Sequence, residues 1–217
     1  MLYPLFLKLE GHPVLVVGAG TVAAQKIGSL LRCGARVTVV APHACEAVAA
    51  MARRGHIDLR LRAFELGDVD AQRLVIAATS EPHTNEIVMR CGRARRVLVN
   101  VVDDPERCDF YVPSVIDRGA LQVAVSTQGA SPALARTLRK EIERYLHPSL
   151  SRYVELVAQA RSRIKHLVPG GYEARRVANE AVLASDARRL LEDGDEPGAT
   201  AAIEAELERL RKGEAAS

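Results

Sequence analysis

The sequence lacks tryptophan, and it has few aromatic residues and little net charge. Aromatic residues make up 4% of the 217 residues, so a hydrophobic core has to be built from aliphatic side chains. With 48% hydrophobic and 26% charged residues, the composition is typical of a soluble globular protein. The formal net charge of +3 is too small to indicate binding to nucleic acid.

Metal-binding and membrane-spanning patterns are also missing. The four cysteines form no C-x-x-C pair and have no histidine at ligand spacing, so we expect no metal site. No apolar run approaches the length of a membrane span, about 20 residues. The N-terminal segment lacks the basic region and cleavage site of a signal peptide. Cysteines without a pairing pattern are typical of reduced thiols, and we expect a cytoplasmic protein that does not enter a membrane.

Buried strands alternate with helices in the first half of the chain. Short apolar runs predict strands at residues 14–17, 36–40, 74–78 and 97–101. Amphipathic segments predict helices at residues 22–31, 44–54 and 84–95. Residues 57–61 alternate like an edge strand, and residues 65–72 are too few for a crossover helix, so we expect a single turn there. The pattern predicts an α/β fold with a Rossmann-type parallel sheet.

A glycine-rich loop joins the first strand to the first helix. It has the form Gly18-x-Gly20-x-x-Ala23, in which Gly18 permits a tight turn and Gly20 lets a pyrophosphate approach the backbone. The helix N-terminus that follows attracts phosphate. The candidate cofactor ligands in this loop are Gly18, Gly20, Thr21 and Val22. The alternative is a tight strand-to-helix turn that binds nothing.

The end of the second strand carries neither an acid for the ribose hydroxyls nor a base for a 2′-phosphate. Val40 and Ala41 occupy the positions where such residues are expected, which gives only a slight preference for NAD over NADP. Residues Ala41, Pro42 and His43 are expected to pass close to the adenosine ribose.

Two aspartates follow the strand at residues 97–101. Ligands of open α/β sheets bind beyond the carboxyl ends of the strands, and Asp103 in the segment Asn100-Val-Val-Asp-Asp-Pro105 lies at such an end. A carboxylate there is able to take a proton while a hydride leaves the same substrate. Alternatively, Asp103 and Asp104 cap a turn before Pro105. These residues by themselves leave both interpretations open.

The pattern changes after about residue 110. Residues 110–116 and 121–125 resemble two strands joined by a turn at 117–119, and Ser131-Pro132 predicts the start of a helix. A lone hairpin is only marginally stable, so a second copy of the chain is an economical partner. We predict an NAD-binding Rossmann domain (1–110), a small β-hairpin dimerisation region with its helix (111–147) and an α-helical C-terminal domain (148–217). The predicted helix carries on one face Leu134, Leu138, Ile142 and Tyr145.

An ordered series of segments carries a family resemblance. It comprises Gly18-Ala-Gly-Thr-Val-Ala23 with Lys26, Ala77-Ala-Thr79 with Asn85, Asn100-Val-Val-Asp103, Phe110 to Arg118, Val123 to Ser126, and Gly129 to Arg136. Together they resemble the precorrin-2 dehydrogenase and sirohydrochlorin ferrochelatase module of siroheme synthases, up to about residue 145 and more loosely beyond.

The resemblance implies NAD-dependent oxidation of precorrin-2 to sirohydrochlorin in siroheme biosynthesis. It implies a homodimer, a catalytic acid/base at Asp103, and Thr79 beside the cofactor. Some family members also insert ferrous iron. Others carry a methyltransferase domain, and we expect this chain to be a form without one. Some have a phosphorylatable serine where this chain has Thr127, which leaves that kind of regulation open.

The substrate is a polycarboxylate, so its site should be electropositive. The candidate residues are Arg118, Arg136 and the helix N-terminus at Ser131. For any single arginine, a solvated helix face balanced by Glu141 and Glu143 is an equal alternative. Two other functions compete with the dehydrogenase: a ferrochelatase alone, and a non-catalytic NAD-sensing regulatory module.

Overall fold

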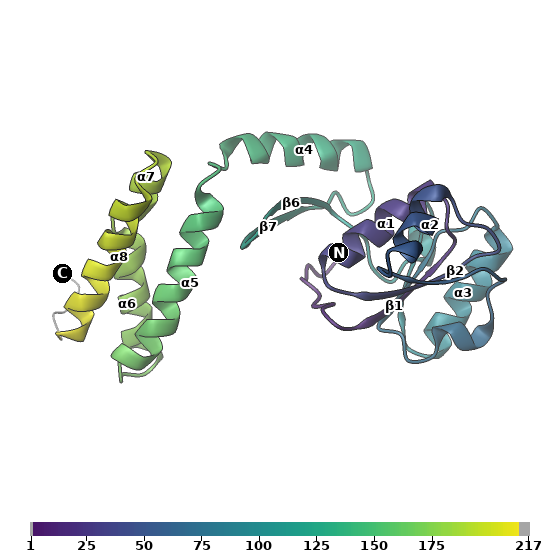
Figure 1. Ribbon diagram of the computed structural model, residues 1–217, viewed down its shortest axis with the longest axis horizontal. Helices are drawn as coiled ribbons and strands as arrows, with labels where there is room; N and C mark the ends of the chain where they lie inside the picture. Colours follow the sequence, from purple (N-terminus) through teal and green to yellow (C-terminus); the bar gives the residue numbers. More distant parts are fainter. Residues whose placement is uncertain (1, 213–217) are drawn as a thin grey trace. The chain divides into compact units, whose positions relative to one another are not determined.

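The computed structural model describes residues 2–212, and the chain divides into two compact units, residues 1–112 and 113–217 (Figure 1). The predicted fold class is confirmed: a parallel sheet with flanking helices is followed by a small antiparallel hairpin and a helical region. The finer division of the second part at residue 147 stays a prediction. Within residues 2–212, no helix is both long and apolar enough to cross a membrane.

The first unit is built on a five-stranded parallel sheet in the order β3-β2-β1-β4-β5. Its strands are β1 (Pro13–Val17), β2 (Arg36–Val40), β3 (Asp58–Arg60), β4 (Leu74–Ala77) and β5 (Leu98–Val101). Its helices are α1 (Thr21–Arg32), α2 (Glu46–Arg53) and α3 (Pro82–Ala94). Short 3₁₀ turns are η1 (Leu66–Val69) and η2 (Pro105–Arg107).

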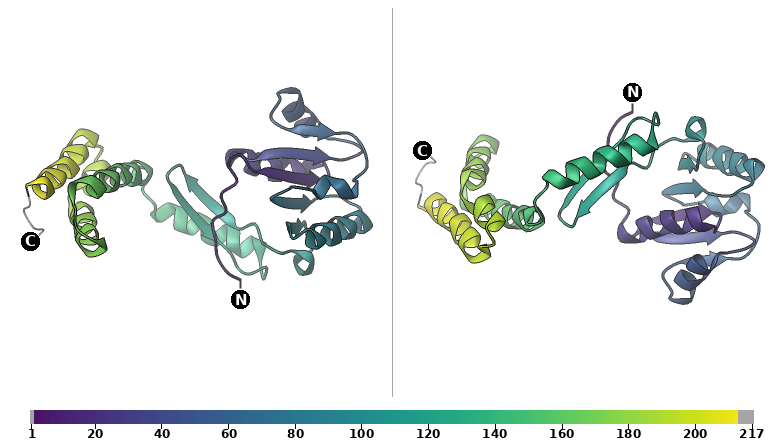
Figure 2. Two further views of the ribbon diagram at one scale, coloured as in Figure 1. Left: turned by 90° about the horizontal axis from the view of Figure 1, so that it is seen from below. Right: turned by 90° about the horizontal axis from the view of Figure 1, so that it is seen from above.

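Helices cover both faces of this sheet (Figure 2). On one face, Val14 and Val16 of β1 pack with Ile27 of α1. On the other face, Leu15 and Val17 pack in a cluster with Val88 of α3. Because β1 is buried on both faces, it reads in the sequence as a continuous apolar run rather than an alternating one.

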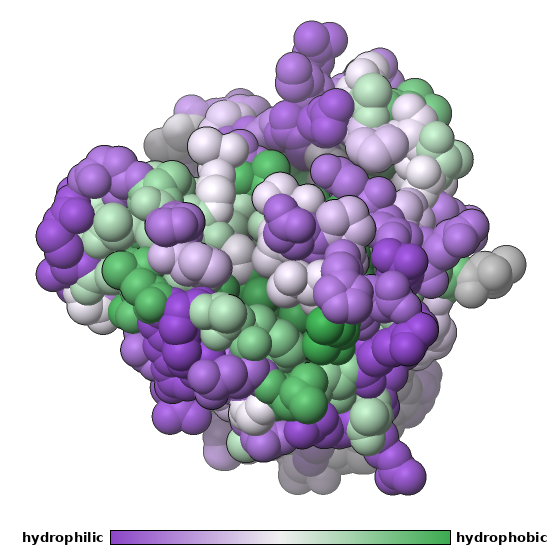
Figure 3. Space-filling model, turned by 90° about the vertical axis from the view of Figure 1, so that its right-hand side faces the viewer, coloured by the Kyte–Doolittle hydropathy of each residue, from purple (hydrophilic) through white to green (hydrophobic). Residues whose placement is uncertain are grey.

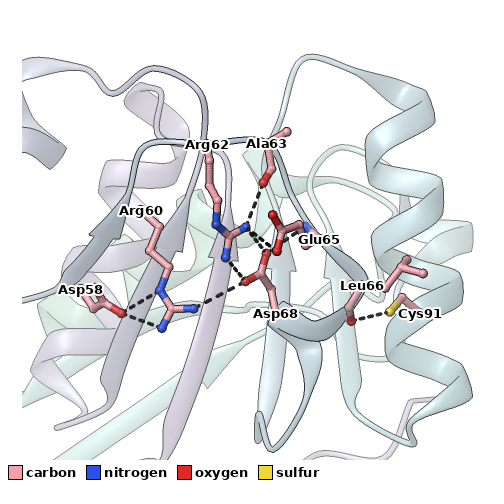
Figure 4. A network of polar contacts seen from close by, with 8 residues as sticks. All are labelled: Asp58, Arg60, Arg62, Ala63, Glu65, Leu66, Asp68 and Cys91. Atoms are coloured by element: carbon pink, nitrogen blue, oxygen red, sulfur yellow. Dashed lines mark hydrogen bonds and ion pairs between the residues drawn. The ribbon is translucent and has the colours of Figure 1, made fainter.

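A single 3₁₀ turn replaces the crossover helix between β3 and β4, as predicted. Its Asp68 side chain is 4% exposed and accepts two hydrogen bonds from Arg62, at 2.8 Å and 2.5 Å (Figure 4). The backbone N–H of Glu65 donates a third at 2.9 Å, and Arg60 lies 3.5 Å away. These bonds lower the pKa of Asp68, the Arg62 hydrogen bond most of all. A buried carboxylate thus ties the short connection to the edge strand.

The second unit opens with a hairpin of β6 (Ser114–Arg118) and β7 (Leu121–Val125). The predicted first strand started too early, at residue 110 instead of 114. The predicted turn at 117–119 began two residues too early, because Arg118 pairs with Leu121 and the turn lies between them, where Gly119 has φ +63°. The carbonyl of Phe110 accepts a hydrogen bond from the Asn100 side chain at 2.9 Å, so this segment is held by a side chain and not by a neighbouring strand.

The rest of the second unit is helical. Ser131 caps α4 (Pro132–Tyr145) by accepting a hydrogen bond from the N–H of Leu134 at 3.1 Å, which confirms the predicted helix start. The remaining helices are α5 (Leu150–Leu167), α6 (Tyr172–Ala184), α7 (Ala187–Glu192) and α8 (Glu196–Arg211). They enclose a core that includes Leu156, Ile164, Val182 and Leu207.

Hydrophobic residues also reach the surface, where one view shows them among hydrophilic ones (Figure 3). In the first unit the exposed ones include Val22, Leu61, Leu66 and Leu98. Exposed apolar residues scattered singly are normal in soluble proteins. The face of α4 is different, because its Leu134, Leu138, Ile142 and Tyr145 are 50%, 36%, 37% and 86% exposed in the single chain.

Candidate active site

Three loops leave the same edge of the parallel sheet. Val17, Ala77 and Val101 are paired across β1, β4 and β5, and each is the last residue of its strand. Neighbouring strands lie about 4.8 Å apart. The strand register therefore brings the glycine loop, the loop with Thr79 and the turn with Asp103 side by side at the carboxyl edge, where open α/β sheets bind their ligands.

The glycine loop needs glycine at its first position. Gly18 has φ +108°, and a Cβ atom there would lie 2.3 Å from the carbonyl oxygen of Ala78. The Gly18 N–H also donates to the carbonyl of Val40 at 2.9 Å. This close approach fixes the loop against the ends of both β2 and β4.

The second glycine has open space above it. Gly20 is the N-cap of α1, and a Cβ atom built on it meets no atom of the described residues 2–212 within 4 Å. The first N–H groups of a helix lack partners within the helix, so those around Thr21 and Val22 are available to an anion. These features fit a dinucleotide pyrophosphate. The roles of Gly18, Gly20, Thr21 and Val22 as cofactor ligands stay predictions.

The loop after β2 is tied to the glycine loop. Pro42 and His43 are exposed, whereas Ala41 is buried and its N–H donates to the carbonyl of Arg60 at 3.2 Å. The N–H of Cys45 donates to the carbonyl of Ala19 at 2.9 Å. The prediction that residues 41–43 contact the adenosine ribose stays open.

Thr79 is held by Asn85, which the sequence grouped with Thr79 in the family resemblance but to which it assigned no contact. The Thr79 hydroxyl lies 2.8 Å from Asn85 Oδ1, and Asn85 Nδ2 donates to the Thr79 carbonyl at 3.1 Å. Asn85 is 8% exposed and lies on the buried side of α3 with Val88. Asn85 occupies a position on the buried face of α3 where the helical spacing predicts an apolar residue, and this could have indicated a buried hydrogen bond. The Thr79 N–H also donates to Asn85 Oδ1 at 3.4 Å, so both the side chain and the backbone of Thr79 are held by Asn85. The role of Thr79 as a cofactor ligand stays a prediction.

The two aspartates after β5 differ in their surroundings. Asp104 forms an ion pair with Arg107 at 3.3 Å. Asp103 is exposed, has φ +61°, and its carboxylate has no hydrogen bond or ion pair with any residue in the described range 2–212. Aspartate is among the non-glycine residues that adopt the left-handed region most readily, and Ala71, Arg96 and Gln128 share this conformation. What distinguishes Asp103 is its carboxylate, unpaired within the described range, at the carboxyl edge of the sheet. The catalytic role of Asp103 stays a prediction.

The predicted substrate residues belong to the second unit. Arg118 lies 3.5 Å from Glu143, and Arg139 pairs with the same carboxylate. The hydroxyl of Ser131 is used as the helix cap. Arg136 is exposed and has no ion pair with any described residue. Arg136 is therefore the predicted residue whose charge is least balanced, and the roles of all three stay predictions.

The loop before α4 is closed by Thr127. Its hydroxyl donates to the carbonyl of Ser131 at 3.0 Å and accepts from the N–H of Ser131 at 3.1 Å.

The described residues contain no group of three or more histidine, cysteine or acidic side chains that could hold a metal ion.

Comparisons with known proteins agree with this geometry. A family model described as "Putative NAD(P)-binding" matches residues 5–114, and one described as "Sirohaem biosynthesis protein central" matches residues 118–145. A siroheme synthase of Thioalkalivibrio sulfidiphilus is 43% identical over 206 residues, which are 95% of this chain and 42% of that protein. One of Methylococcus capsulatus is 45% identical over 166 residues, covering 76% of this chain and 35% of that protein.

A solved structure has the same fold. It is described as "SirC, precorrin-2 dehydrogenase" and superposes with a TM-score of 0.74 at 24% identity, covering 94% of this chain and 100% of that one. The chain spans less than half the length of the siroheme synthases it matches. The resemblance to siroheme synthases found in the sequence motifs is confirmed, and the chain belongs to the NAD(P)-binding family that the first model describes.

Proposed function

We propose that this protein is an NAD-dependent precorrin-2 dehydrogenase, which oxidises precorrin-2 to sirohydrochlorin in siroheme biosynthesis. The observation that carries the proposal is the unpaired Asp103 carboxylate, held in a left-handed turn on the strand edge that also bears the glycine loop. The siroheme synthase relatives support the choice of substrate.

The residues of the glycine loop fit the cofactor. The space above Gly20 and the uncapped start of α1 accept the pyrophosphate, with Thr21 and Val22 supplying N–H groups. Residues 41–43 would lie near the adenosine ribose, and the backbone of Thr79 would lie near the opposite end of the dinucleotide. NAD, when bound, supplies the acceptor for the hydride that precorrin-2 loses.

Asp103 takes the proton that accompanies the hydride. Its carboxylate is exposed and has no competing partner among the described residues, so it is free to meet a C–H or N–H of the macrocycle. Arg136 and Arg118 would bind carboxylates of the substrate, and an arginine is suited to paired contacts with such groups. Arg118 would have to bind the substrate carboxylate in addition to Glu143, or in place of it.

The proposed assembly is a homodimer formed through the hairpin and α4. Leu134, Leu138 and Ile142 form an exposed apolar face on α4, and Val115 of the hairpin is 43% exposed. Exposed apolar patches of this kind mark interaction surfaces. The cysteines of the described chain are all unpaired, which supports a reducing compartment such as the cytoplasm.

Replacing Asp103 by asparagine tests the proposed chemistry. Asparagine tolerates the left-handed backbone, so this substitution removes the carboxylate without the strain that alanine would add. We expect kcat to fall by about 10²-fold or more, with the Kd for NAD unchanged. Asp104→Asn is the matched control, because the Asp104 carboxylate forms a partly exposed ion pair with Arg107. Its kcat should stay within about threefold of wild type.

Three results would change the assignment. A wild-type rate for Asp103→Asn would remove Asp103 from the mechanism. Formation of siroheme from sirohydrochlorin and ferrous iron, with no reaction of precorrin-2, would identify a ferrochelatase. NAD binding without turnover of any tetrapyrrole would instead favour a regulatory module.

A further inference from the structure

We propose that Cys108 is a positioning residue for Asp103: its thiol fastens both sides of the turn that presents the carboxylate. This inference rests on the proposed function, because it assigns Cys108 a role in the reaction through Asp103. It involves no oxidation or covalent step at the sulfur.

The thiol bonds to the residue where the strand ends. Cys108 Sγ accepts a hydrogen bond from the N–H of Val101 at 3.2 Å and lies 3.1 Å from the carbonyl oxygen of the same residue. It also lies 3.2 Å from the carbonyl oxygen of Asp104. A thiol has one proton, so it donates to one of these two carbonyls at a time. Val101 and Asp104 are the residues immediately outside Val102 and Asp103.

A backbone hydrogen bond closes the turn itself. The N–H of Asp104 donates to the carbonyl of Val101 at 3.3 Å, with Asp103 at the third position and φ +61°. The third position of such a turn favours glycine or asparagine. Aspartate adopts this conformation at a higher cost than glycine, so contacts that hold the turn stabilise it. The contacts of the thiol with Val101 and Asp104 hold the outer side of the turn, and the N–H of Val102 donates to the carbonyl of Ala77 at 2.9 Å on the side of the sheet.

The sulfur is in turn held from the sheet. Asn100 Nδ2 donates to Cys108 Sγ at 3.3 Å and to the carbonyl of Phe110 at 2.9 Å. The neighbouring Asp109 exchanges two hydrogen bonds with Val99 of β5, at 2.8 Å and 3.0 Å. Cys108 therefore cannot shift along β5 without breaking these bonds. Its contacts with Val101 and Asp104 hold the turn in a fixed position relative to β5.

The state of the thiol suits this role. Cys108 is half-buried, and burial raises its pKa above the ordinary value. The thiol thus keeps its proton at neutral pH and remains a donor to the turn. The carboxylate of Asp103, by contrast, stays exposed to its substrate.

The test compares Cys108→Ala with a buried thiol remote from the turn. We expect Cys108→Ala to lower kcat for precorrin-2 oxidation by about tenfold or more, with the Kd for NAD and the KM for precorrin-2 within about twofold. Cys91→Ala is the control, because Cys91 lies in α3 and its Sγ bonds to the carbonyl of Leu66. Its kcat should stay within about twofold of wild type. Cys108→Ser keeps a group that donates and accepts hydrogen bonds, but its Cβ–O bond is shorter than the Cβ–S bond of cysteine. Its kcat should lie between those of wild type and Cys108→Ala.

A double-mutant cycle separates positioning from general destabilisation. If Cys108 acts through Asp103, adding Cys108→Ala to Asp103→Asn should lower kcat by less than about twofold further. A full additional loss in the double variant would overturn the inference, and so would a Cys108→Ala kcat within about twofold of wild type.

Loss of NAD binding in Cys108→Ala, or an inactive wild type, would each have a definite meaning. If Cys108→Ala does not bind NAD, Cys108→Ser is measured in its place, provided that it binds NAD. A kcat for Cys108→Ser at least about threefold below wild type supports the inference, and an unchanged kcat overturns it. A wild-type protein that does not oxidise precorrin-2 refutes the proposed function itself. A wild-type protein that is active, with Cys108→Ala equally active, refutes only this inference.

Discussion

Replacing Asp68 by asparagine should destabilise the first unit by about 2 kcal/mol. The change removes a bidentate contact with Arg62, and hydrogen bonds to charged groups each contribute about 1.5–3 kcal/mol. The loss is smaller than their sum because the Arg62 side chain is 33% exposed and is rehydrated when its partner goes. Asparagine also keeps an oxygen for the N–H of Glu65.

Urea unfolding measures this change. The chain has no tryptophan, so unfolding should be followed by far-UV circular dichroism. Asp58→Asn is the matched control, since Asp58 pairs with Arg60 at 2.9 Å but is 56% exposed. Its free energy of unfolding should change by less than about 0.5 kcal/mol. Equal effects of the two substitutions would refute the argument from burial.

The effect should also depend on pH in a defined direction. The hydrogen bond from Arg62 lowers the pKa of Asp68 in the folded protein, so the carboxylate stabilises the fold above its unfolded pKa of about 3.9. That contribution is lost as the pH falls through the lower, folded pKa. The difference between wild type and Asp68→Asn should therefore be constant from about pH 7 to 5 and shrink below about pH 4. A difference that persists unchanged at about pH 3 would contradict this reasoning.

The remaining predictions concern the glycine loop and the apolar face of α4. Gly18→Ala should destabilise the protein by about 2 kcal/mol or more, because its Cβ would meet Ala78. Gly20→Ala should cost about 1 kcal/mol or less, since Gly20 is a helix N-cap with open space around it. Gly20→Asp should abolish NAD binding in titration calorimetry through conflict with the pyrophosphate. A stable Gly18→Ala, or retained affinity in Gly20→Asp, would count against the loop assignment. Leu138→Glu on the apolar face of α4 should give a monomer in light scattering. The control Lys140→Glu, on another face of the helix, should remain a dimer. A monomeric wild-type protein would refute the proposed assembly.

The sequence predicted the parallel sheet because its strands are buried on both faces. The run of residues 14–17 and the glycine loop after it required little tertiary information, since the motif combines a strand, a tight turn and a helix start. The short link at residues 65–72 was predicted from its length alone. The start of α4 was predicted because Ser131-Pro132 is a local capping signal.

Features that depend on distant side chains were not predictable in this way. Residues 110–113 have a strand-like composition, but Asn100 binds the carbonyl of Phe110, and no local pattern shows that contact. The burial of Asp68 depends on two arginines brought beside it by the edge strand. The left-handed conformation of Asp103 carries no glycine or asparagine signal, so the sequence located the residue and not its conformation.

The most direct test of the account is an anaerobic assay with enzymatically generated precorrin-2 and NAD, in which NADH and sirohydrochlorin are measured together. Both products should appear in equal amounts, and neither should appear when NAD is omitted. Confirmed NAD binding with no formation of either product would contradict it.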